Sequence, residues 1–358
     1  MVRPTADPAS VLVVRPGRGD TGLLVAAERA GRLDVRAAHD VDLPSLTPSG
    51  TPNKATSAVI AGLIGELGAA PDSAWLALPP GSTPLRRVEV ELPIDRAVEH
   101  GQVVDALQRA RVALSDGGRT AVLSCRPTRY AVDGTWGEGD PTGRKGRRLT
   151  VEATALCAAL GLLARFERAL AEAGLALSGV VAPAEALVAA CLPDREGRAV
   201  HVGHGATLAV AARGGAITHQ AHVPLGRRHL EQDAAEVSAL ERDAARAAVA
   251  AVVAGEAHLA AAAVQARLAE LRELLDAAQE AAGFGALPRT PCVTSGLPPA
   301  ALADDGDDQS VLPCAAHGDP LLEGTALLAL GLRGEADQPA LVRSADRVGV
   351  LGWLRARF

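Results

Sequence analysis

Residues 199–226, AVHVGHGATLAVAARGGAITHQAHVPLG, have the types and spacing that best fit ligand chemistry. Gly203 and Gly205 follow an apolar run that is typical of a strand. A Gly-x-Gly turn after a strand lets backbone N–H groups approach a phosphate closely, because no Cβ stands in the way. An ordinary glycine-containing hairpin has the same pattern, so the turn alone leaves a phosphate loop and a structural turn both open.

Four histidines in and around this stretch raise the question of a metal site: His201, His204, His219 and His222. His219 and His222 are three residues apart on an expected strand, so their side chains face opposite sides. No carboxylate or thiolate lies close to His201 and His204 in the sequence. We therefore expect no metal site here.

Composition limits the class of protein. The 358 residues carry a net charge of −6, which argues against a nucleic-acid binder, because such proteins present a basic surface. The five cysteines are far apart and form no Cys-x-x-Cys pair, so we expect neither a zinc site nor a disulfide framework, and a reduced cytoplasmic compartment fits best. We find no signal peptide and no apolar run long enough to span a bilayer.

The first half of the chain predicts strands and helices in alternation. Apolar segments at 11–14, 22–27 and 33–38, joined by short turns, indicate an antiparallel meander, which a helix over 55–67 follows. The next unit has the pattern of a small α+β insert: strands at 74–78 and 85–92, a helix over 97–114, and a strand pair from 120 to 132.

The second half predicts two further strand and helix pairs before the glycine turn. They are a strand at 151–156, a helix over 158–173, a strand at 177–182, and a helix over 184–191. Pro183 precedes this last helix at the position where its missing N–H costs least. Residues 230–282 read as almost wholly helical with a break at Gly255, and a strand at 290–295 and a helix over 321–330 end the periodic pattern.

Residues 129–149, RYAVDGTWGEGDPTGRKGRRL, resemble the stretch of bacterial FtsA in which a Tyr/Phe-x-Val-Asp-Gly strand precedes Asp-Pro-x-Gly and Arg-Leu. Residues 200–233 are similar to that family's second phosphate loop and the hairpin after it, including a Val-Pro-Leu-Gly sequence. The resemblance implies an α/β, actin-like (RNase H-like, ASKHA) fold of two lobes. It also implies an inserted SHS2-type 1C subdomain and a reduced, mostly helical 2B region.

On this resemblance we expect six parts, with these boundaries: 1–72 and 151–198 for the first lobe (1A), 73–150 for the 1C insert, 199–235 and 289–332 for the second lobe (2A), 236–288 for the 2B-like region, 333–345 for a linker, and 346–358 for an amphipathic membrane-targeting helix.

The nucleotide site departs from the family pattern. The family's first and second phosphate loops carry acids where this chain has Arg15 and His201. Asp20 lies at the far end of the first turn, where we interpret it as a solvated turn residue. Mg²⁺ requires hard oxygen ligands that guanidinium and imidazole do not provide, so we expect no ATP hydrolysis and no cofactor. The sequence leaves open that Arg15 and the Arg227–Arg228 pair bind phosphate without Mg²⁺. ATP stays a candidate ligand only when bound in this way, without the metal.

The degenerate nucleotide site implied by the resemblance takes residues from the two phosphate loops and from 294–298, the counterpart of the family's adenosine-side Gly-Gly-Gly turn: Arg15, Gly17, Gly203, Gly205, Thr207 and Gly296.

The last residues have the pattern of an amphipathic helix. On a helical wheel an apolar arc with Trp353 beside it is flanked by two arginines, and the set we expect to bind membrane is Val350, Leu351, Trp353, Leu354, Phe358, Arg355 and Arg357. Apolar and aromatic side chains with flanking arginine suit a helix lying among anionic headgroups. A last helix docked on the protein's own core fits the same pattern.

The resemblance implies a division scaffold at the cytoplasmic face of the bacterial inner membrane, at the division site. The expected partners are FtsZ, anionic lipids, a second copy of the chain and later divisome membrane proteins, and not nucleic acid. The alternative is a PilM-like assembly protein of a pilus or secretion system. Residues 75–93, WLALPPGSTPLRRVEVELP, suggest it, and it would bind a membrane partner's cytoplasmic peptide without a lipid-binding helix.

Overall fold

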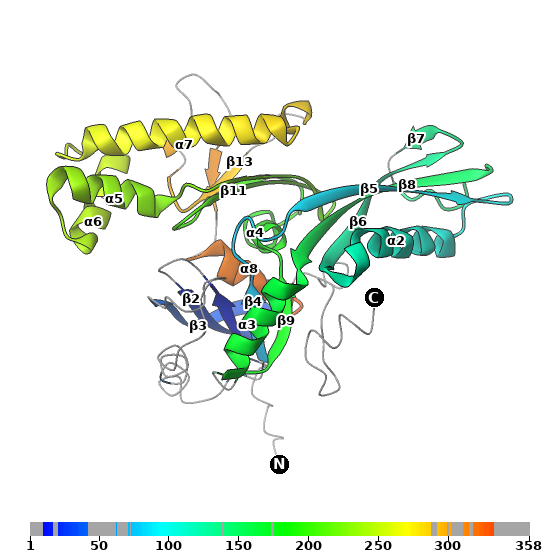
Figure 1. Cartoon of the computed structure of the whole chain (residues 1–358), viewed down its shortest axis with the longest axis horizontal. Coiled ribbons are helices and arrows are strands. Elements are labelled where there is room, and N and C mark those ends of the chain that lie inside the picture. The colour runs from blue at the N-terminus through cyan, green and yellow to red at the C-terminus, as the bar shows by residue number, and fades with distance from the viewer. Residues whose placement is uncertain are drawn as a thin grey trace, which may run out of the picture.

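The computed structural model shows two lobes and an insert that extends to one side (Figure 1). The residues that it describes are 10–16, 21–41, 62, 71, 73–137, 139–172, 175–287, 292–298, 301–302, 311–314 and 318–332. Most of the helix predicted over 55–67, the linker 333–345 and the predicted membrane-targeting helix 346–358 lie outside these residues.

The first lobe is built on a five-stranded sheet with the order β3-β2-β1-β4-β9. Its strands are β1 (Ser10–Arg15), β2 (Thr21–Arg29), β3 (Arg32–Val41), β4 (Ser73–Ala77) and β9 (Leu177–Val181). The first three form the predicted antiparallel meander, whereas β4 and β9 join β1 in parallel. Because helices and loops cover this sheet, β1 and β2 are almost continuously apolar rather than alternating.

The second lobe repeats this arrangement, with the order β12-β11-β10-β13-β14. Its strands are β10 (Gly197–Val202), β11 (Thr207–Arg213), β12 (Ala216–Val223), β13 (Cys292–Ser295) and β14 (Val311–Pro313). The hairpin predicted at Gly214–Gly215 is confirmed as the β11–β12 turn, in which both glycines have positive φ. Each lobe therefore has three antiparallel strands followed by two parallel ones.

The insert is a four-stranded sheet, β5-β8-β6-β7, with one helix against it. Its elements are β5 (Leu85–Pro93), α2 (His100–Leu114), β6 (Thr120–Val132), β7 (Thr135–Gly137) and β8 (Arg148–Ala159). The structure differs from two predictions here. β4 belongs to the sheet of the first lobe, and β8 continues the insert's sheet to Ala159, so the insert starts after β4 and ends at 159 rather than covering 73–150. The strand pair predicted over 120–132 is the single strand β6, because its full length pairs with β8.

The helical region over the second lobe consists of three helices, α5 (Arg227–Ser238), α6 (Arg242–Val253) and α7 (Ala261–Ala281). The predicted break at Gly255 is confirmed, and a second break follows α5, where Ala239 has a left-handed φ of 51°. Val264, Leu268, Leu271 and Leu275 form the buried stripe of α7, which lies over the strands of the second lobe (Figure 1).

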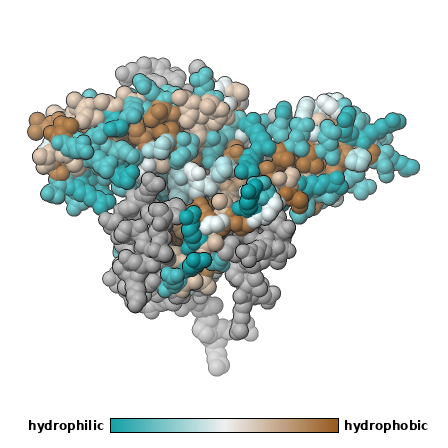
Figure 2. Space-filling model, viewed as in Figure 1, coloured by the Kyte–Doolittle hydropathy of each residue, from teal (hydrophilic) through white to brown (hydrophobic). Residues whose placement is uncertain are grey.

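Hydrophilic residues are interspersed with apolar ones over the helical region and the insert on the face shown in Figure 2. Within the described part of the chain, no helix is long and apolar enough to cross a membrane.

Two helices, one from each lobe, pack on the sheet of the opposite lobe. α4 (Pro183–Cys191) leaves the first lobe but packs on the strands of the second, and α8 (Pro320–Ala329) leaves the second lobe but packs on β1, β2 and β4 of the first. The two helices touch where Gly324 meets Ala186: a Cβ on Gly324 would overlap the carbonyl group of Ala186. α3 (Leu160–Glu172) packs on the outside of the first lobe, with Leu163, Phe166 and Leu170 buried.

One disulfide corrects the expectation that the cysteines would stay unpaired. Cys191, at the end of α4, is bonded to Cys314, just after β14, although 123 residues separate them in sequence. The fold brings their Cα atoms to 5.1 Å, inside the range that a disulfide spans. Sequence spacing alone gave no sign of this pair, because the two cysteines meet only once α4 and β14 are in place.

Gly324→Ala tests the helix crossing. The added methyl group would be forced against the backbone of α4, and we expect it to lower the free energy of unfolding by about 3 kcal/mol, at the upper end for an overpacked core. Urea unfolding followed by circular dichroism measures this change.

Gly161→Ala is the matched control, because Gly161 lies in α3 with nothing near its Cβ position. Here alanine is expected to be neutral or to stabilise by about 0.5 kcal/mol through helix propensity. Equal effects of the two substitutions would contradict the close crossing.

Candidate functional site

The ends of β1, β10 and β13 and the first turn of α8 meet between the lobes, at the place where the resemblance implies the nucleotide cleft, and this meeting point is called the cleft below. Arg15, the last residue of β1, points toward Asp319, the N-cap of α8, with 2.6 Å between Nε and Oδ2. The side chains are 10% and 20% exposed. The other carboxylate oxygen of Asp319 accepts a hydrogen bond of 2.9 Å from the Leu321 N–H.

The charge of Asp319 is held in place by its neighbours. Burial opposes ionisation, but the Arg15 guanidinium, with His201 and the Leu321 N–H, keeps the pKa of Asp319 below its ordinary value. A carboxylate that is paired and used as a helix cap has both oxygens engaged. Asp319 is therefore an ionised structural group.

His201 occupies the position where the resemblance places the second acid. Its Nδ1 lies 3.0 Å from Oγ of Ser295, on the parallel strand β13. Burial lowers the pKa of His201 to about 4, and Arg227 and Arg15 act in the same direction against Asp319. The imidazole is accordingly neutral at neutral pH.

The glycine turn after β10 uses its own backbone groups. The Gly203 N–H donates to the Ala206 carbonyl at 3.0 Å, and the carbonyls of Gly203 and His204 accept from the N–H groups of Arg227 and Arg228 at 2.9 and 2.8 Å. The start of α5 is thus tied directly to the turn. Of the two interpretations of this turn, the hydrogen bonds favour the structural one.

The structure brings some of the predicted nucleotide residues together and separates others. Arg15, Gly203 and Gly296 lie at the cleft, where Gly296 has φ +86° and no room for a Cβ beside the Val202 carbonyl. Thr207 is fully buried and donates from Oγ1 to the Leu225 carbonyl at 2.7 Å, so its hydroxyl serves the hairpin. Gly205 has open space around it, and Gly17 and Asp20 lie outside the described residues.

Asp319 is an acidic residue of the cleft that the sequence analysis did not identify. The signal was present, since Asp before Pro at the start of an apolar helix is an N-cap pattern. Arg227 and Arg228 also belong to the cleft wall, and within the described part of the chain the Nε atom of each is buried without a hydrogen-bond partner.

These residues do not fit a magnesium nucleotide. Mg²⁺ is held through carboxylate oxygens and water, yet Asp319 forms an ion pair with Arg15 and caps α8. The turn that would cradle a phosphate donates one of its N–H groups to itself. We derive no reaction step through such a ligand.

The remaining histidines have structural contacts. His219 forms an edge contact with Phe284, with 5.6 Å between ring centroids, and His222 lies against Gly81. Among the described residues, no group of three or more His, Cys, Asp or Glu side chains is placed to hold a metal ion.

The motif at 129–149 also has a structural explanation. Asp133 and Gly134 have positive φ and make the β6–β7 turn, where the Asp133 carboxylate accepts hydrogen bonds from the N–H groups of Arg147 and Arg148. The Asp-Gly pair thus ties the β6–β7 turn to the start of β8. The motif is thus explained by the folding of the insert, and it does not indicate what the insert binds.

Comparisons with known proteins place the fold. The chain matches no protein-family model and no curated protein sequence. Among solved structures, the PilM-PilN type IV pilus biogenesis complex superposes with a TM-score of 0.55 at 17% identity, covering 90% of this chain and 96% of that chain. The ethanolamine utilization protein EutJ from Carboxydothermus hydrogenoformans gives 0.52 at 16% identity, covering 91% and 92%.

When the strands are numbered within each lobe, both five-stranded sheets have the order 3-2-1-4-5. This order and the helices that pack on the opposite lobe agree with the similarity to these solved structures. The chain has the actin-like fold, with an α+β insert and a helical region in addition to the two lobes.

Proposed function

We propose that this protein is a non-catalytic actin-fold assembly protein, which binds other proteins at a membrane-associated complex and does not turn over ATP. The observation that carries the proposal is the Arg15–Asp319 ion pair. It places a fixed cation where the resemblance implies a metal-binding acid. It also engages the carboxylate that could otherwise have served the metal.

The chain-length likeness to PilM supports an assembly role. That solved structure is a complex of PilM with PilN in type IV pilus biogenesis. An identity of 17% supports a shared fold and no shared partner. The partner of this chain is therefore part of the proposal. We infer a protein partner from a membrane-associated assembly, met from the cytoplasmic face.

The finer, FtsA-like version of the proposal adds FtsZ as the partner and the division site as the location. Its support is the sequence resemblance at 129–149 and 200–233 and the amphipathic pattern of 346–358. The contacts of Asp133 and the Gly203 turn explain those motifs by folding alone. The PilM-like version therefore has the broader support, and the C-terminal segment is the feature that separates the two.

Calorimetry tests the nucleotide part of the proposal. Titration of the full chain with ATP and Mg²⁺ is expected to give no Mg²⁺-dependent binding and no phosphate release, since Asp319 is paired with Arg15 and caps α8. A parallel titration in EDTA tests the arginine-only mode that the sequence leaves open. Micromolar, Mg²⁺-dependent binding with turnover would show that the protein is an ATPase.

A double-mutant cycle tests the structural role of the ion pair. Arg15→Ala leaves Asp319 buried and unpaired, so we expect a loss of about 3 kcal/mol in the free energy of unfolding. Adding Asp319→Asn removes the stranded charge while keeping a helix cap, and should recover part of that loss.

Urea unfolding of both single variants and the double variant gives the coupling energy. Additive effects of the two substitutions would mean that the pair does not hold the cleft.

Vesicle sedimentation tests the C-terminal segment. If 346–358 is a lipid-binding helix, removing 351–358 or making Trp353→Glu should abolish sedimentation with anionic vesicles, because the apolar arc enters the headgroup layer. Ala356→Ser, on the opposite arc, is the matched control and should sediment like the unchanged protein. Sedimentation that persists after the deletion would remove the support for the FtsA-like version and leave the PilM-like one.

A further inference from the structure

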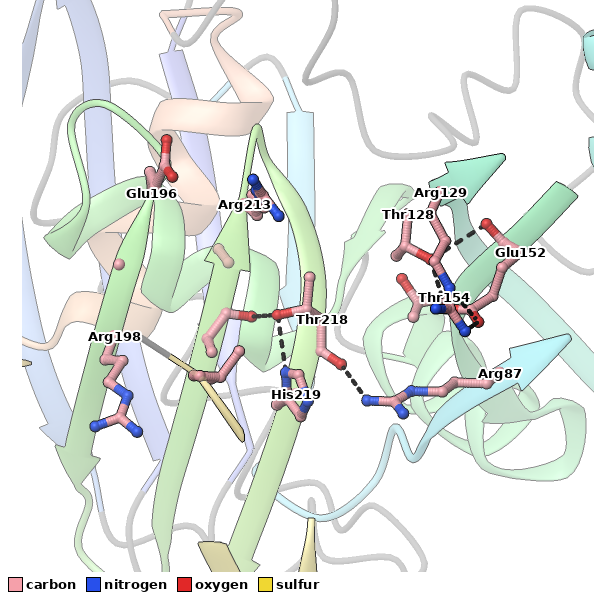
Figure 3. A pocket seen from close by; sticks show the side chains of 14 residues that line it. Arg87, Thr128, Arg129, Glu152, Thr154, Glu196, Arg198, Arg213, Thr218 and His219 are labelled. Atoms are coloured by element: carbon pink, nitrogen blue, oxygen red, sulfur yellow. Dashed lines mark hydrogen bonds and ion pairs between the residues drawn. The ribbon is translucent and has the colours of Figure 1, made fainter. Parts of the chain in front are cut away.

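A second hollow lies away from the cleft, between the insert and the second lobe. It has a volume of 410 Å³ and is lined by β5, β6 and β8 on one side and by β10, β11 and β12 on the other. Figure 3 shows the two walls facing each other, with Arg87 reaching across from β5. The volume is within the range of small-molecule sites.

The lining combines small residues with long cationic ones. The hollow is open because small side chains line it: Gly197, Ala211, Ala212, Thr154 and Thr218. Four arginines and two glutamates also line it, so the net charge of the lining is positive. Of these arginines, Arg129 is neutralised by Glu152, to which it donates two hydrogen bonds of 2.9 and 2.6 Å. Its guanidinium also stacks on Trp136.

Two arginines on opposite walls have no such partner. Arg87 donates one hydrogen bond of 3.1 Å to the Thr218 carbonyl, and Arg198 donates one of 2.9 Å to the Phe284 carbonyl. Within the described part of the chain neither is paired with a carboxylate, and Nε of Arg198 is buried without a hydrogen-bond partner. A buried donor left unpaired costs about 1–3 kcal/mol, so a ligand that satisfies it is favoured.

His219 lies within reach of both charges. Burial lowers the pKa of its imidazole, and Arg87 and Arg198 lower it further. The ring is therefore neutral and, with Nδ1 3.0 Å from Oγ1 of Thr218, adds a polar group to the wall. The two guanidinium groups thus act on the same part of the hollow from opposite sides.

We propose that this hollow binds a small oxyanion ligand, a phosphate or carboxylate compound, whose oxygens are held by Arg87 of the insert and Arg198 of the second lobe. Guanidinium groups match such oxygens in charge and in their planar pair of donors. A ligand held from both walls would link the insert to the second lobe. This site is separate from the cleft and does not rest on the proposed function.

Titration calorimetry of the full chain, with inorganic phosphate and with succinate as probes, tests the proposal and distinguishes the two sources of the oxyanion. We expect saturable binding of at least one probe, weakened tenfold or more by Arg87→Ala and by Arg198→Ala. Arg198→Lys keeps the charge but loses the planar donors, and should bind with an intermediate affinity.

Two control variants locate the binding. Arg86→Ala removes the same charge from the adjacent exposed position of β5, outside the lining, and should bind as the unchanged protein does. Arg227→Ala tests the cleft as the alternative location, because a loss of binding in this variant alone would place the probe at the cleft. Thermal unfolding of every variant separates a loss of binding from a loss of folding, and Arg87→Ala alters an exposed residue, so it tests the site even where Arg198→Ala unfolds.

Hydrogen exchange supplies an independent measurement, since a ligand that links the two walls should slow amide exchange in both β12 and β6. The proposal is overturned by no saturable binding of either probe, by equal binding in Arg87→Ala and the unchanged protein, or by a loss of binding in Arg227→Ala alone. Binding of an acidic peptide with no binding of phosphate or succinate would also overturn it.

Discussion

The close crossing of α4 and α8 is the constraint on which the rest of the structure depends. Each helix is connected in sequence to one lobe and packs on the sheet of the other, so neither lobe can complete its core alone. Gly324 and Ala186 have almost no side chain at the point of contact, which lets the backbones approach. The Cys191–Cys314 disulfide fastens the end of α4 to the segment that leads into α8.

The chemistry of the cleft follows from this crossing, because the first turn of α8 arrives directly beside the end of β1. Asp319 caps the helix and meets Arg15, and both groups gain from the contact. The pKa values of His201 and Asp319 are lowered, so the unfolded chain takes up protons that the folded chain refuses. This contribution to stability is complete above about pH 6.5 and is lost as the pH falls through the lowered pKa values. The contacts of His201 and Asp319 therefore stabilise the fold most at neutral pH.

The sequence predicted most elements of the fold but only part of the cleft. Apolar runs such as 11–14 and 22–27 carry their own strand pattern, and Pro183 and Gly255 mark helix ends by backbone chemistry alone. The replacement of acids by Arg15 and His201 was also readable in the chain. The sequence could not predict which distant residues pair, namely Arg15 with Asp319 and Cys191 with Cys314. These pairs form only because α4 and α8 each pack on the opposite lobe.

The insert is attached to the second lobe by both polar and apolar contacts. Its identified hydrogen bonds to β12 are polar and partly exposed: Arg87 donates to the Thr218 carbonyl and Gln220 to the Thr83 carbonyl. Such bonds contribute about 1 kcal/mol each. Leu123 and Leu156 at the base of the insert also belong to the same buried apolar cluster as Ile217 of β12, so the shared core extends from the helix crossing into the insert. A ligand held by Arg87 and Arg198 would add a polar link between the insert and the second lobe beside this apolar contact.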